Sequence, residues 1–131
     1  MAARWAAVFL LALVLGGTTL QQPAADGRRL PLTAIELVQQ ADRHYRAEQW
    51  ALAIEKYEAA LALQPDLVRA FFFLGNSYDR LYDPARAGEA ANDACLEKAV
   101  ENYRRAAEQD EDPRMRTLAL EYLRAAARPR H

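Results

Sequence analysis

An internal repeat constrains the fold of this chain more than any other feature of its sequence. Shifting the sequence by 34 residues places residues 41–46 on residues 75–80, and shifting it by 46 places residues 53–57 on residues 99–103. The first shift aligns Ala41 with Gly75, and the second aligns Tyr57 with Tyr103. The offsets differ by 12, so the second copy holds about a dozen extra residues between its two matching segments. A fixed period of this length is typical of stacked supersecondary units.

Apolar side chains recur three and four residues apart from residue 33 to residue 127, whereas no stretch alternates as a half-buried strand would. Thr33 and Glu36 have the spacing of a capping box, which predicts a helix start. Short amphipathic helices are marginal alone in water, so we expect them to pack as antiparallel pairs. Five helices are predicted, beginning at Thr33, near Trp50, near Asp66, at Asn92 or Asp93, and at Asp112-Pro113, with Pro65 ending the second.

The period, the small residues at helix crossings, the aromatic residues and the closing proline together resemble the tetratricopeptide-repeat (TPR) family. The resemblance implies an all-α, antiparallel helix-hairpin solenoid of about two and a half repeats, the second with an insertion. In the first repeat it rests on Leu37, Ala41, Trp50, Ala53, Tyr57, Ala60 and Pro65. In the second it rests on Phe71, Leu74, Gly75, Tyr78, Ala99, Tyr103 and Ala106, and in a third half-repeat on Met115, Leu118, Ala119 and Tyr122.

Residues 80–94 form the insertion, at a place where repeats of this kind turn tightly. Asp83 followed by Pro84 predicts a capped start of a short alanine-rich segment within it. The insertion is either a tolerated loop or an element that contacts a partner. Near it, Cys95 is expected to be a small buried apolar residue rather than a reactive thiol. His44, which stands where the repeat usually has an aromatic residue, is expected to be a packed core ring.

Residues 1–22 have the layout of a secretory signal peptide. Arg4 precedes an unbroken apolar run over residues 5–15, which is shorter than the roughly 20 residues of a membrane span. An uncleaved signal anchor is the alternative, with a membrane tether through residues 5–20. We expect residues 23–32 to be a linker, residues 33–127 the repeat domain and residues 128–131 a tail. The expected location is periplasmic or secreted, or membrane-anchored if the signal is retained. Fifteen of the 17 basic residues are Arg, which with the many Ala indicates GC-rich coding and favours a bacterial source. Together with the signal layout, this predicts a bacterial exported protein.

The charge balance and the lack of catalytic motifs favour a binding protein. With 17 basic and 18 acidic residues, the chain lacks the basic excess typical of nucleic-acid binders. It has two histidines, one serine and one cysteine, and no phosphate-binding, nucleophile-elbow or metal motif. We therefore expect no catalytic residue, no metal ligand and no cofactor.

The resemblance also implies a partner site, because the first helix of each TPR lines a concave groove that binds peptides or helices. The predicted function is a non-catalytic interaction scaffold or adaptor of the cell envelope. A self-assembling structural subunit is the alternative, since residues 118–123 leave an apolar side uncovered. Asp42 stands where the carboxylate-binding site of similar proteins has Asn and would repel a C-terminal carboxylate, whereas the groove arginines would attract an acidic segment. The predicted partner-binding residues are Val38, Asp42, Tyr45, Arg46, Phe72, Asn76, Asp79, Arg80, Arg116, Leu120, Leu123 and Arg124.

Overall fold

A computed structural model describes residues 32–129, and all regular structure within them is helical. The predicted signal segment and most of the predicted linker lie outside the described residues. No helix of the described part is long and apolar enough to cross a membrane. The elements are α3 (Ala34–Arg46), α4 (Trp50–Leu63), α5 (Val68–Leu81), the 3-10 helix η2 (Pro84–Arg86), α6 (Ala90–Gln109) and α7 (Pro113–Ala126).

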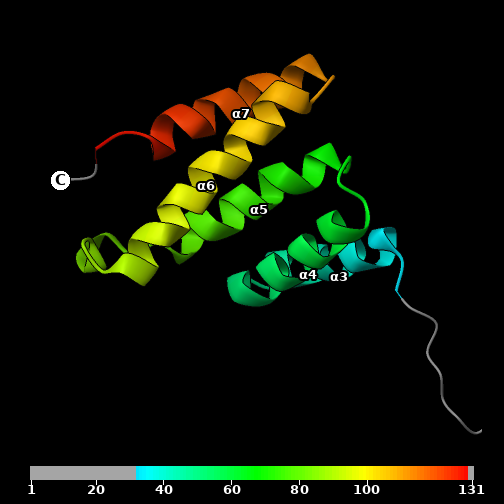
Figure 1. Ribbon diagram of the computed structural model, residues 1–131, viewed down its shortest axis with the longest axis horizontal. Coiled ribbons are helices and arrows are strands. Elements are labelled where there is room, and N and C mark those ends of the chain that lie inside the picture. Colours follow the sequence, from blue (N-terminus) through cyan, green and yellow to red (C-terminus); the bar gives the residue numbers. More distant parts are fainter. Residues whose placement is uncertain (1–31, 130–131) are drawn as a thin grey trace, which may run out of the picture. The chain divides into compact units, whose positions relative to one another are not determined.

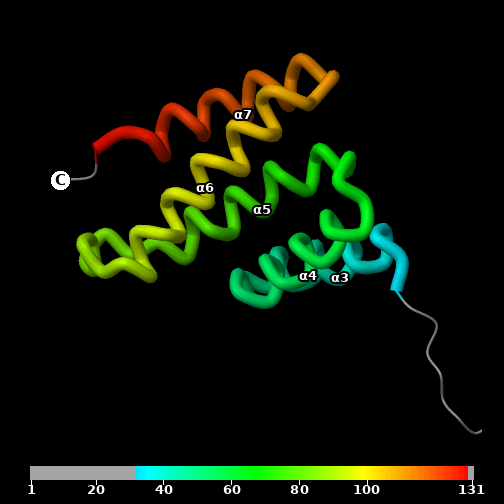
Figure 2. The backbone as a smooth tube through the Cα atoms, in the orientation of Figure 1, coloured from blue at the N-terminus to red at the C-terminus, as the bar shows by residue number. Residues whose placement is uncertain are grey.

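Consecutive helices form antiparallel pairs, each packed mainly on the next one along the chain. Figure 1 shows α5 between the α3–α4 hairpin and α6, and α7 beside α6. The backbone trace in Figure 2 follows the chain from α5 through the insertion into α6, which runs back along α5. This is the predicted all-α helix-hairpin solenoid, with two hairpins and a further first helix.

Helix α3 begins with the capping box that the sequence predicted. The Glu36 backbone N–H donates to Thr33 Oγ1 at 3.2 Å, and the Thr33 N–H donates to Glu36 Oε2 at 2.8 Å. Hydrogen bonds from the Thr33 backbone and hydroxyl lower the pKa of the Glu36 carboxyl. Helix α7 also begins with a side-chain cap. The Asp112 carboxylate accepts the Arg114 N–H at 2.9 Å, and Pro113 occupies the first turn.

Small residues allow α5 and α6 to cross closely. A Cβ atom on Gly75 would lie 3.0 Å from Cδ1 of Tyr103 and 3.2 Å from the backbone oxygen of Ala99. These distances are shorter than ordinary van der Waals contact, so an added Cβ would require the Tyr103 ring and the Ala99 backbone to shift by a few tenths of an ångström. Ala99 and Tyr103 are fully buried at this crossing. The crossing position that the internal repeat aligns with Ala41 is therefore a true close contact.

Aromatic rings fill the spaces between the helices. The Phe72 ring lies 5.8 Å from the Tyr103 ring and 5.3 Å from the Tyr122 ring, measured between centroids. Phe72 thus joins α5 to both α6 and α7. Edge-to-face and tilted ring pairs of this kind add to the energy of burial.

Polar contacts of Tyr78 in α5 link this helix to both α4 and α6. The Tyr78 hydroxyl donates to the Glu58 carboxylate of α4. Lys98 of α6 places its Nζ 5.1 Å from the centroid of the Tyr78 ring and 3.4 Å from its hydroxyl. Burial raises the pKa of Tyr78, and the bond to Glu58 raises it further. Tyr78 is therefore a neutral donor over the ordinary pH range.

Two helix starts differ from the predictions. Helix α5 begins at Val68 rather than near Asp66, and Leu67 at its N-cap makes no side-chain bond. Helix α6 begins at Ala90, two residues before the predicted caps Asn92 and Asp93. These two side chains act on the insertion instead of on the helix start.

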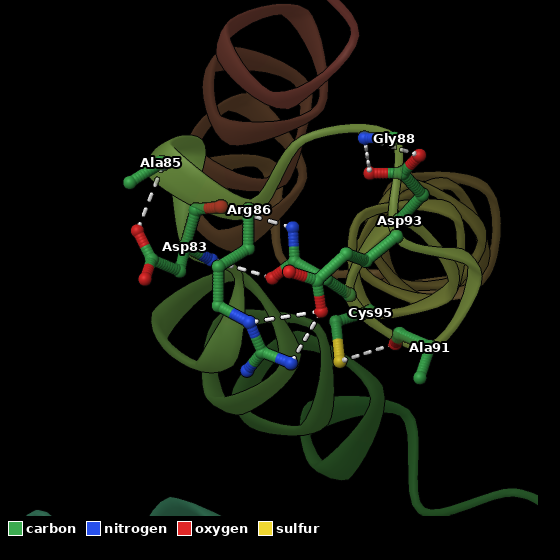
Figure 3. Close-up of polar contacts among 9 residues, drawn as sticks. Asp83, Ala85, Arg86, Gly88, Ala91, Asp93 and Cys95 are labelled. Atoms are coloured by element: carbon green, nitrogen blue, oxygen red, sulfur yellow. Dashed lines mark hydrogen bonds and ion pairs between the residues drawn. The ribbon is translucent and has the colours of Figure 1, made fainter.

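The insertion is held by side-chain bonds to its own backbone (Figure 3). The Asp83 N–H donates to Asn92 Oδ1 at 2.8 Å, and Asn92 Nδ2 donates to the Asp83 carbonyl oxygen at 2.9 Å. The Asp93 carboxylate accepts the N–H of Gly88, whose φ of 93° is the left-handed conformation that favours glycine. The predicted cap Asp83 does bond the Ala85 N–H at the start of η2. Only residues 82–89 lie outside the flanking α-helices, because the rest of the insertion extends α5 and α6.

Cys95 and His44 are less buried than the sequence suggested. Cys95 is half-buried, and its Sγ donates to the Ala91 carbonyl one turn earlier at 3.5 Å. His44 is also half-buried, and its Nδ1 lies 2.7 Å from Oε1 of Gln49 in the α3–α4 turn. The expectation that His44 is a packed core ring is therefore wrong, because the imidazole is half-buried and hydrogen-bonds Gln49 in the turn.

Candidate partner-binding groove

A groove of about 430 Å³ lies between the first helices of the two repeats. We call it the α3–α5 groove. Its walls come from α3 and α5, and α4 contributes one residue. It is lined by Val38, Asp42, Tyr45, Arg46, Tyr57, Arg69, Ala70 and Phe73.

A smaller hollow of about 280 Å³ continues the groove toward the α4–α5 turn. The two share Val38, Arg69 and Ala70, and the hollow adds Asp66, Leu67 and Val68. Apolar side chains therefore line two adjacent positions along the same path.

The groove contains a carboxylate that already has a hydrogen-bond donor. The Tyr57 hydroxyl donates to Asp42 Oδ1 at 2.6 Å. Burial raises the pKa of Tyr57, and its bond to Asp42 raises it further. Tyr57 thus remains a donor, and it holds Asp42 in one orientation at the groove wall.

Tyr45 joins α3 to α5 beside the groove. Its hydroxyl donates to Asn76 Oδ1 at 2.8 Å, and its ring makes edge contacts with Trp50 and Phe73 at 5.3 Å each. This bond orients the buried Asn76 amide, since Oδ1 is the acceptor and Nδ2 remains as a donor. Tyr45 of α3 therefore positions Asn76 of α5.

A buried hydroxyl lies near Asn76. Tyr103 is fully buried, and its hydroxyl makes no hydrogen bond within the described part of the chain. Burial raises the pKa of Tyr103 most, the Asp79 charge raises it further, and the Asn76 side chain lowers it. These effects place Asn76 and Asp79 near the Tyr103 hydroxyl.

Three arginines surround Tyr45 and the groove. Arg46 and Arg69 line it, are exposed, and form no ion pair with any residue between 32 and 129. Arg80 lies over the Trp50 ring, with Cζ 5.7 Å from the ring centroid, and its charge lowers the pKa of Tyr45 against the larger effect of burial. The groove lining carries two guanidinium groups and one carboxylate, and the adjoining hollow adds a second carboxylate, Asp66.

The structure separates the twelve predicted partner-binding residues into groups. Val38, Asp42, Tyr45 and Arg46 line the groove, Asn76 accepts a hydrogen bond from Tyr45 at its wall, and Arg80 lies over Trp50, outside the lining. Phe72 is buried against aromatic rings in the core. Asp79 is half-buried and engaged in an interaction.

The four predicted residues of α7 do not line the α3–α5 groove. Arg116 donates through Nε and Nη2 to the Asp110 carbonyl oxygen at 3.1 and 3.0 Å, which caps the C-terminal end of α6. Leu120 and Arg124 are exposed and Leu123 is half-buried. Their role in partner binding is a prediction that stands apart from the groove.

Four groove residues were missed by sequence reasoning, namely Tyr57, Arg69, Ala70 and Phe73. Tyr57, one of the first-repeat residues that carry the family resemblance, is fully buried, and its hydroxyl reaches Asp42. Arg69 and Phe73 are four residues apart and Asn76 follows three later, so all three share one side of α5. Extending that spacing back from Asn76 would have identified them.

A second cavity, of about 560 Å³, lies beside the insertion. The insertion contributes Ala87 and Gly88, α6 contributes a row of residues one turn apart, and the end of α7 closes the other side. Its full lining is Tyr82, Ala87, Gly88, Asp93, Leu96, Glu97, Val100, Glu101, Arg104, Ala126, Ala127, Arg128 and Pro129.

Comparison with known proteins supports the repeat assignment. Residues 41–81 match the family model described as TPR repeat, which covers the end of α3, all of α4 and all of α5. TPR repeats generally mediate protein–protein interactions, and proteins of that family are typically non-catalytic. Neither the curated proteins nor the solved structures contain a match to this chain.

Proposed function

We propose that this chain is a non-catalytic adaptor of the cell envelope that binds a protein or peptide partner in the α3–α5 groove. The observation that carries the proposal is the groove itself, which lies between the first helices of adjacent repeats. Its lining combines apolar walls with two guanidinium groups that form no ion pair within residues 32–129 and with a fixed carboxylate. Residues 41–81, which match the TPR repeat, supply seven of the eight lining residues.

A matched pair of variants tests this proposal. The full chain, carrying a photo-crosslinking amino acid in place of Arg69, is expressed in its host and irradiated. We expect it to trap a discrete partner, whereas the same amino acid in place of Arg114, exposed at the start of α7, should not. Equal trapping at both positions, or trapping only at position 114, would remove the groove from the proposal.

The envelope location is part of the proposal and is supported by the sequence layout of residues 1–22. It has its own test. Cell fractionation and N-terminal sequencing of the mature protein should find it outside the cytoplasm, either cleaved near residue 22 or retained as an anchor. A full-length protein recovered only from the cytoplasm would contradict it.

Self-assembly through α7 is the second candidate function. Leu120 and Tyr122 of this last described helix are 37% and 38% exposed, so their apolar surface is available to a second copy of the chain. Light scattering of the purified chain at increasing concentration distinguishes the two functions. A monomer throughout that range would exclude assembly, whereas an oligomer dispersed by Leu120→Lys would support it.

A further inference from the structure

We draw no further inference here: the strongest candidate, the cavity of about 560 Å³ between the insertion, α6 and the end of α7, carries nothing, because its lining mixes three carboxylates with two guanidinium groups and nothing in the structure shows what covers it.

Discussion

Helix α5 has neighbouring helices on two sides, and the space between the helices differs between the two sides. Toward α6, Gly75 brings the backbones so close that a single added Cβ would lie 3.0 Å from the Tyr103 ring. Toward α3, the longer side chains of Arg69, Phe73 and Asn76 keep the helices apart, and a groove of about 430 Å³ remains. The repeat thus uses residue size on opposite sides of one helix to separate a closed packing surface from an open binding surface.

The difference extends to the polar groups. On the closed side, the Tyr103 hydroxyl is buried without a hydrogen-bond partner among the described residues. On the open side, the hydroxyl of Tyr57 has Asp42 and that of Tyr45 has Asn76. At the Gly75 crossing close packing thus dominates, whereas beside the groove directed hydrogen bonds fix both tyrosine hydroxyls.

Among the predicted changes, alkaline pH should lower the free energy of unfolding most, because it ionises buried tyrosines on both sides of α5. Burial raises the pKa of Tyr57, Tyr78 and Tyr103 above the ordinary value near 10. Below about pH 10 the three tyrosines are protonated in both the folded and the unfolded chain, and their contribution to stability is fully present. Above about pH 10 the unfolded chain loses these protons before the folded chain does, so the free energy of unfolding falls. At about pH 11 the three phenols together should cost about 4 kcal/mol of the free energy of unfolding.

Urea unfolding at a series of pH values, with phenolate absorbance recorded in parallel, checks this. The phenolate signal of these tyrosines should appear together with loss of helical circular dichroism. Ionisation of all six tyrosines near pH 10 with helicity retained would contradict the burial of the three rings.

Gly75→Leu should have the next largest effect, about 3 kcal/mol of destabilisation, because the side chain would overlap Tyr103 and the Ala99 backbone. Urea unfolding monitored by circular dichroism measures it. Ala51→Leu, at an exposed position of α4, is the control and should change stability by less than about 0.5 kcal/mol. Equal stability of Gly75→Leu and the parent would show that α5 and α6 do not cross closely.

Asn92→Ala should cost about 2 kcal/mol, because it removes two hydrogen bonds and leaves the Asp83 backbone groups without these partners. Hydrogen exchange should show faster exchange of the Asp83 amide, while the amides of α3 remain protected as before. A uniform change across the chain would mean that Asn92 supports the whole fold rather than the insertion.

Tyr45→Phe should cost the least, about 1 kcal/mol, since the ring contacts with Trp50 and Phe73 are retained and only the bond to Asn76 is lost. The same urea measurement applies, and Tyr82→Phe would show the effect of removing a hydroxyl away from the groove. If Tyr45→Phe were as damaging as Gly75→Leu, the open side of α5 would be as tightly packed as the closed side.

Much of the fold could be predicted from the sequence, because helix periodicity and caps are local signals. The repeat offsets identified Gly75 and Ala99 as crossing positions, and Thr33 with Glu36 gave the first helix start. The start of α6 could not be predicted in the same way. Asn92 and Asp93 are good caps by type, but their partners are backbone groups of residues 83 and 88, whose positions depend on the folded insertion.

The groove was predicted only in part for a related reason. The resemblance to the repeat family predicted Val38, Asp42, Tyr45 and Arg46 of α3, because the first helix of each such repeat lines the groove. Tyr57 belongs to a second helix, and its hydroxyl reaches the groove only because its ring spans the layer between α4 and α3. Arg116 was assigned to the site by its position, but its guanidinium binds the Asp110 carbonyl oxygen that ends α6.

The measurement that tests the two-sided account of α5 most directly compares stability and partner crosslinking in a single variant, the one that carries the photo-crosslinking amino acid in place of Arg69. The account predicts an unfolding free energy within about 0.5 kcal/mol of the parent, since Arg69 is exposed, together with crosslinking of a discrete partner. A large loss of stability, or no crosslinked partner, would contradict the separation of a packing side from a binding side.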